Sequence, residues 1–118
     1  MNLTTEQIDD INIVHVDGSI DTMTRMRIQA VECIRDSSLD LVLDLRRADL
    51  IDSAGLSTLV QIIRRYNEVS RSIVMVAPCP SVLHILRMVS IDQIIPILDT
   101  LEAALDRIRE DRAKRIDA

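Results

Sequence analysis

The stretch LVLDLRRADLIDSAGLSTLVQIIRR, residues 41–65, changes character halfway along its length. Residues 39–45 form an apolar run interrupted by aspartates, a pattern typical of a β-strand that is covered on both faces. From Leu56 the apolar residues recur at helical spacing. Gly55, one of the two glycines in the chain, lies at the junction, directly after Asp52-Ser53-Ala54. The stretch therefore predicts a strand, a turn and a helix in succession.

The same alternation continues on both sides of this stretch. Before it, the sequence predicts strands over 3–8 and 11–16, joined by Asp9-Asp10, a break at Asp17-Gly18 and a helix over 23–35. After it, the sequence predicts a strand over 72–76 and a helix over 81–89, with Val82, Ile85, Leu86 and Val89 facing inward. A strand over 94–98 follows, which Pro96 limits to an edge of the sheet. The capping-box pattern at 99–102 then begins the last helix. We expect a single α/β domain over 1–118, in the order β-β-α-β-α-β-α-β-α. Its sheet should be mostly parallel, with an N-terminal antiparallel hairpin.

The tail after Ile108 alternates charges of opposite sign, at i,i+4 spacing for Glu110–Lys114 and Asp111–Arg115. We interpret residues 109–118 as a solvated helix end that frays.

Composition excludes several functions. The chain of 118 residues has 47% hydrophobic residues, a net charge of −5 and a single aromatic residue, Tyr66. Its acidity and the lack of aromatic stacking platforms argue against nucleic acid and anionic lipid as partners. Cys33 and Cys79 stand far apart and are interpreted as small buried side chains, without a disulfide or a metal. No signal peptide or membrane-spanning run is recognisable, so we expect a cytoplasmic protein.

Enzymatic functions find little support in the sequence. The motif GxSxG is absent around Ser53, and no glycine-rich phosphate loop exists. No Cys, His or Glu stands at metal-ligand spacing from His15, and His84 is expected to be a surface or packed residue. Asp44, Asp49 and Asp52 could form a carboxylate cluster, but catalysis is the weaker class, and no cofactor or metal is expected.

The junction itself has two explanations. Either Ser53 or Asp52 caps the helix, which would be a purely structural role. A cap, however, does not require glycine in the first turn, where it costs roughly 1 kcal/mol relative to alanine. Gly55 therefore indicates that some group approaches the backbone closely.

Two segments resemble STAS domains, and in particular the stand-alone anti-sigma factor antagonists. VDGSIDTMT, residues 16–24, resembles one family segment, and LIDSAGLSTLV, residues 50–60, resembles the family's Asp-Ser-x-Gly-Leu segment. The resemblance covers essentially the whole chain. It implies that Ser53 is phosphorylated by an anti-sigma factor that is also a serine kinase. It further implies a partner-binding surface made of Asp21, Asp52, Ser53, Ala54, Gly55 and Leu56.

The implied function is a phosphorylation switch, not an enzyme. The unphosphorylated protein would bind the serine-kinase anti-sigma factor and release its sequestered sigma factor, and phosphorylation of Ser53 would abolish this binding. A serine phosphatase would restore the unmodified form. The alternative is a module of the same fold that docks on a transporter ATPase or another regulatory complex without phosphorylation.

Overall fold

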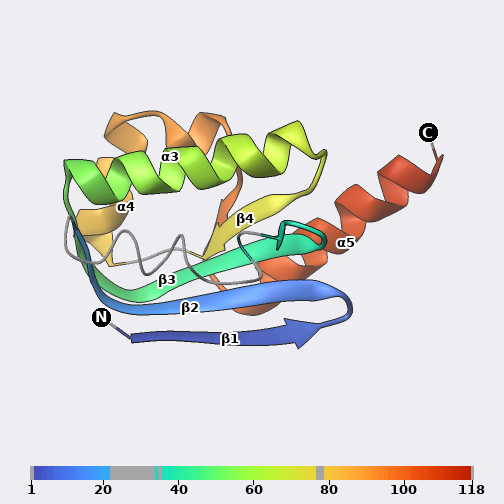
Figure 1. The fold of residues 1–118 in the computed structure, drawn as a ribbon, viewed down its shortest axis with the longest axis horizontal. Coiled ribbons are helices and arrows are strands. Elements are labelled where there is room, and N and C mark those ends of the chain that lie inside the picture. Colours follow the sequence, from blue (N-terminus) through green and yellow to red (C-terminus); the bar gives the residue numbers. More distant parts are fainter. Residues whose placement is uncertain (1, 22–33, 35, 77–78, 118) are drawn as a thin grey trace.

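The computed structural model describes residues 2–21, 34, 36–76 and 79–117, with side chains up to Lys114. Five strands form one sheet in the order β1-β2-β3-β4-β5, in which β1 runs antiparallel to β2 and the other neighbours are parallel (Figure 1). The elements are β1 (Asn2–Ile8), β2 (Ile11–Ile20), β3 (Asp40–Ile51), α3 (Ser53–Glu68), β4 (Ile73–Val76), α4 (Pro80–Met88), the 3-10 helix η1 (Ile91–Gln93), β5 (Ile97–Leu98) and α5 (Leu101–Asp117). The predicted α/β class, with its antiparallel first hairpin, is confirmed.

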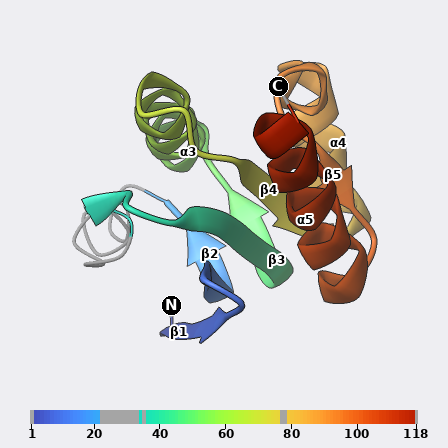
Figure 2. The same ribbon diagram turned by 90° about the vertical axis from the view of Figure 1, so that its right-hand side faces the viewer.

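The sheet has a hydrophobic core on each face, because successive side chains of a strand point to opposite sides. On β3, Leu41, Leu43 and Leu45 pack into the larger cluster, together with buried residues of α3 and α4. Val42 points the other way, into a smaller cluster with α5. Figure 2 shows α3 and α5 on opposite sides of the sheet. Tyr66, the single aromatic residue, is fully buried in the larger cluster.

Two strands are longer than the sequence predicts. β2 continues through Asp17-Gly18 to Ile20, so the predicted break there is wrong. The register between β2 and β3 shifts between His15 and Asp17 and again between Gly18 and Ser19, and Gly18 has a φ of 108°. Glycine therefore marks a bulge within the strand, where the chain bends without leaving the sheet. β3 likewise runs on to Ile51.

The connections follow local turn chemistry. Asp9 and Asp10 both have positive φ angles, which suits a two-residue hairpin loop and confirms the predicted turn. Thr100, rather than Asp99, caps α5: its hydroxyl oxygen accepts the N–H of Ala103 at 3.1 Å. The inward position predicted for Val89 is wrong, since this side chain lies just beyond α4 and is 44% exposed.

Part of the sequence-based prediction falls outside the described residues. The helix predicted over 23–35 is almost entirely in this part of the chain. Of that range, the structure describes Ile34, which is buried in the larger cluster.

The C-terminal helix is bound to the sheet through Arg109 and Arg112, so these two residues of the predicted solvated tail have fixed partners. Arg112 binds the buried carboxylate of Asp40 at 2.8 Å and donates to the backbone carbonyls of Asp9 and Asp10 at 2.8 and 2.6 Å. Arg109 binds the Asp9 side chain. Two arginines one turn apart therefore connect α5 to the β1–β2 loop and to the start of β3.

Replacing Arg112 with alanine should lower the free energy of unfolding by about 2–3 kcal/mol, because it removes a cation that contacts the buried carboxylate of Asp40 and donates to two backbone carbonyls. Arg107→Ala is the matched control, since Arg107 forms a long 3.8 Å ion pair with Asp111 on the exposed side of the same helix. We expect the control to cost about 0.5 kcal/mol or less. Urea denaturation of both variants measures the difference, and equal losses would contradict the anchoring role of Arg112.

Candidate functional site

The candidate site forms where β2 and β3 end side by side. Ile20 is paired with Ile51, and the N–H of Asp52 donates to the carbonyl of Ile20 at 3.2 Å. Asp21 and Asp52 follow these paired residues, so both acids lie at the carboxyl edge of the sheet. This edge is where α/β proteins usually place their binding sites.

Asp52, and not Ser53, caps helix α3. Its backbone is extended, and its carboxylate accepts the N–H of Gly55 at 2.8 Å. Ser53 is the first residue of the helix and is exposed. Its hydroxyl forms no hydrogen bond with any other described residue. The serine side chain is thus available to a partner while the aspartate stabilises the helix terminus.

Gly55 is required for a reason inside the chain. A Cβ atom added to this residue would lie 2.1 Å from the carbonyl oxygen of Ile20 and 2.7 Å from its carbonyl carbon. The close approach predicted from the sequence is real, but β2 makes it. Gly55 is itself buried, so the close contact that it permits is one within the chain. Ala54 and Leu56 on either side are half-buried.

Leu50, two residues before Asp52 in the chain, is an exposed hydrophobic residue that the sequence reasoning missed. Its side chain is 53% exposed, next to the acidic edge, whereas Ile51 is buried. The alternation of sides along a strand was the available signal, because a buried Ile51 places Leu50 on the outside. Nearby, Ser19 donates to Asp49 at 3.2 Å and connects β2 with β3 just before the site.

Cys79 corrects another sequence-based interpretation. Its thiol is half-buried rather than buried, and it lies 3.1 Å from the hydroxyl of Ser81 at the start of α4. Hydrogen bonds from the Ser81 hydroxyl, and then from the backbone of Val82, hold the pKa of this thiol below its ordinary value. Cys33 lies outside the described residues.

The two histidines that the sequence analysis considered lie outside this site. His84 is exposed on α4, as expected for a surface residue. His15 belongs to a different polar network, in which Glu6 and Asp44 contact its ring although nothing in their spacing suggested it. Among the residues that the structure describes, no group of three His, Cys, Asp or Glu side chains is placed to hold a metal ion. No helix in this described part is long and apolar enough to cross a membrane.

The comparisons with known proteins agree on one fold. The family model described as STAS domain matches residues 2–104. An anti-sigma factor antagonist from Mycobacterium paratuberculosis is similar in structure with a TM-score of 0.79 and 28% identity, over 92% of this chain and 93% of that one. The anti-sigma factor antagonist SpoIIAA is similar in its unphosphorylated form, with a TM-score of 0.69 and 21% identity, over 92% of this chain and 98% of that one.

Two further similar structures differ in what their names state. The phosphorylated form of SpoIIAA from Bacillus has a TM-score of 0.71 and 17% identity, over 91% of this chain and 99% of that one. A sulfate transporter family protein from Wolinella succinogenes has a TM-score of 0.76 and 14% identity, over 88% of each chain. At identities of 14% and 17%, these two similarities show a shared fold alone.

Replacing Gly55 with alanine should lower the free energy of unfolding by about 2–3 kcal/mol, because the added methyl group forces β2 and α3 apart. Ser57→Ala, on an exposed position of the same helix, serves as the control and should stay within about 0.5 kcal/mol of the parent. Thermal and chemical denaturation would test both. A Gly55→Ala protein as stable as the parent would contradict the internal role of this glycine.

The two neighbours at the helix start should differ in the same assay. Asp52→Ala removes the capping acceptor and should cost about 1 kcal/mol. Ser53→Ala should change the free energy of unfolding by about 0.5 kcal/mol or less, since its hydroxyl stabilises nothing in the described structure. A larger loss for the serine variant would reverse the assignment of the cap.

Proposed function

The chain belongs to the STAS-domain family, and from this premise we propose that it is a binding protein switched by phosphorylation of Ser53. In its unphosphorylated form it binds an anti-sigma factor that is also a serine kinase, and so releases the sigma factor that this partner sequesters. Phosphorylation of Ser53 abolishes the binding, and a serine phosphatase restores it. The contact surface comprises Asp21, Asp52, Ser53, Ala54 and Leu56 with the exposed Leu50, and Gly55 supports it from within.

The observation that carries the proposal is the exposed hydroxyl of Ser53 at the first position of α3, which forms no hydrogen bond with the described part of the chain. A kinase needs a hydroxyl that it can reach without unfolding the substrate. Ser53 meets this requirement because Asp52 performs the capping role. Thr58, by contrast, is buried one turn further on, and its hydroxyl donates to the carbonyl of Ala54.

The fold should tolerate a phosphate at this position. A phosphoserine carries a charge of about −1.5 to −2, and helix N-termini favour negative charge. After the N-cap Asp52, the first turn of α3 contains no acidic residue. The modification therefore need not refold the chain, and its effect falls on the surface.

A partner that accepts the neutral surface would reject the phosphorylated one. Asp21 and Asp52 already border Ser53 at the carboxyl edge of the sheet, so a phosphate adds charge of the same sign. Leu50 adds an apolar contact that favours a dry interface, where an unpaired charge is costly to desolvate. Shifting a partner from mostly bound to mostly free needs roughly 5 kcal/mol of differential affinity.

The fold also admits a second function, a docking module that is never phosphorylated. The similarity to a sulfate transporter family protein favours it, because that protein shares the fold. The two functions differ in one property: in a docking module, a charge at Ser53 has no regulatory effect.

Titration calorimetry of an anti-sigma factor kinase with three proteins distinguishes these functions. The parent and Ser53→Ala should bind alike, whereas Ser53→Asp should bind at least about tenfold more weakly because of charge repulsion at the contact. The phosphorylated protein should bind more weakly still, since phosphate carries more charge than a carboxylate. Added salt should recover part of the loss only, because buried charges are poorly screened.

Mass spectrometry after incubation with the kinase and ATP gives the matching covalent evidence. Phosphate should be found on Ser53 and be lost in Ser53→Ala, while Ser57→Ala, changed at an exposed position one turn along α3, should be labelled like the parent. Phosphate found mainly on Ser57 would overturn the assignment. Equal affinities of all forms would leave the docking module.

A further inference from the structure

A second polar cluster lies between the two ends of the same strands, where the sheet face is open. α5 covers the face that holds Ile11, Ile13 and Val42. Further along the strands, the same face carries His15 and Asp44, which are paired across β2 and β3. A pocket of about 520 Å³ opens there. It is lined by Asn2, Thr4, His15, Val16, Asp17, Asp44, Arg46 and Arg47.

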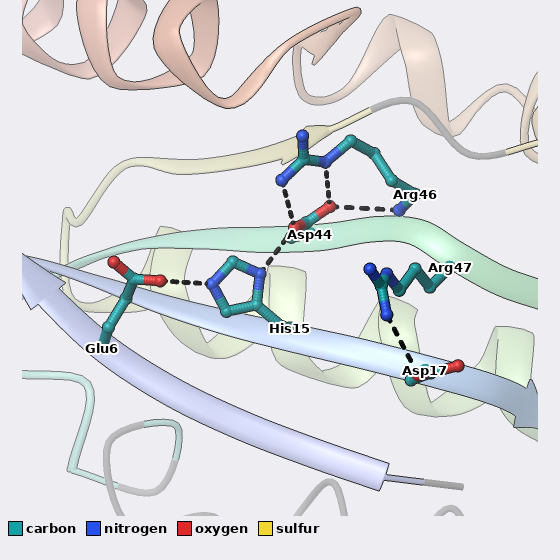
Figure 3. A network of polar contacts seen from close by, with 6 residues as sticks. All are labelled: Glu6, His15, Asp17, Asp44, Arg46 and Arg47. Carbon is teal, nitrogen blue, oxygen red and sulfur yellow. Dashed lines mark hydrogen bonds and ion pairs between the residues drawn. The ribbon is translucent and has the colours of Figure 1, made fainter.

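Three adjacent strands meet at the His15 ring (Figure 3). Its Nδ1 atom lies 2.6 Å from a carboxylate oxygen of Asp44 on β3, and its Nε2 atom lies 2.6 Å from a carboxylate oxygen of Glu6 on β1. Ionised carboxylates only accept hydrogen bonds, so both ring nitrogens must donate. The geometry is therefore that of a doubly protonated, positively charged imidazole between two negative groups.

The Asp44 side of this arrangement is rigid. The Asp44 side chain is 7% exposed, and Arg46 binds both of its oxygens at 2.9 Å while the Arg46 N–H adds a third bond at 3.1 Å. Burial by itself raises the pKa of Asp44, but the hydrogen bonds from Arg46 and His15 outweigh it and lower the pKa to about 2. The carboxylate thus stays ionised at any ordinary pH.

The Glu6 side is more exposed to solvent than the Asp44 side. Its side chain is 46% exposed and comes from β1, the edge strand, which pairs with β2 alone among the described strands. We propose that Glu6, His15 and Asp44 form a proton-controlled clamp on β1, closed when the imidazole carries both protons and released at Glu6 when it loses one. The proton leaves Nε2 for solvent, and Nδ1 keeps its proton because the buried Asp44 needs the donor.

The neighbouring charges leave this mechanism intact. On β3, Arg46 is engaged by Asp44, and Arg47 lies 3.8 Å from Asp17 of β2 in a largely exposed pair. On α5, Arg109 and Arg112 bind Asp9, Asp10 and Asp40 at the other end of the strands. Glu6 and Asp44 are therefore the charged groups that the His15 ring contacts directly.

The sign of the pH dependence follows from these contacts. Burial lowers the pKa of His15, but hydrogen bonds to Glu6 and Asp44, and their charges, outweigh it and raise the pKa above the ordinary 6.5. The clamp then stabilises the fold fully below pH 6.5 and loses this effect as the pH rises through the higher folded pKa. The contribution of Asp44 is present above pH 3.8 and disappears as the pH falls toward 2.

Nitrogen-15 spectra of the His15 ring test the proton step. From about pH 5 to about pH 10, His15 should titrate above the ordinary histidine pKa of 6.5 and retain the proton on Nδ1 once neutral. Glu6→Gln should move the titration of His15 to lower pH, because it removes one of the two negative charges. A His15 ring that titrates at or below the ordinary value of 6.5, or that keeps its proton on Nε2, would overturn the proposal.

Amide hydrogen exchange tests the effect on the strand. After correction for the intrinsic exchange rate, β1 amides of the parent should open more often as His15 is deprotonated, by roughly tenfold for each pH unit by which its pKa is raised. His15→Gln and Glu6→Gln should show flat profiles, and His84→Gln should behave as the parent does. Parallel profiles for the parent and the His15 variant would show that β1 is held without the clamp.

Discussion

The carbonyl group of Ile20 is the point on which the arrangement of the candidate site depends. It accepts the N–H of Asp52, and it occupies the space in which any side chain at Gly55 would begin. The end of β2 therefore packs closely against the first turn of α3. This contact places Asp21 beside Asp52 and turns the first helical residue, Ser53, outward. Gly55 is thus a condition for the close packing of the chain on itself.

The division of labour between Asp52 and Ser53 follows from this packing. The carboxylate of the aspartate is directed back to the N–H of Gly55, so the helix terminus is stabilised without the serine. A residue that has no structural role can be modified at a small cost in folding stability, and the helix dipole favours the added negative charge. The physical basis of the proposed switch is thus a separation of roles between two adjacent side chains.

On the face of the sheet that α5 covers, the charged side chains are arranged differently from those at the candidate site. Asp40 and Asp44 are both buried on β3, and each is matched by an arginine, Arg112 from α5 and Arg46 from β3 itself. Beyond the part of this face that α5 covers, the second cationic partner of Asp44 is His15, where a further arginine would have a permanent charge. Arginine keeps its charge at all relevant pH values, whereas histidine does not, so the open end of this face is the part that responds to protons.

The sequence by itself determined the class of fold and the position of the junction between β3 and α3. Apolar alternation around residues 41–65 is a local property, and it predicted the strand, the turn and the helix that hold Ser53. What only the tertiary structure decided depends on contacts between distant segments: the Ile20 carbonyl at Gly55, the Glu6–His15–Asp44 contacts and the fastening of Arg112 to Asp40. Strand register and helix docking create these contacts, and neither is encoded in the spacing of residues along the chain.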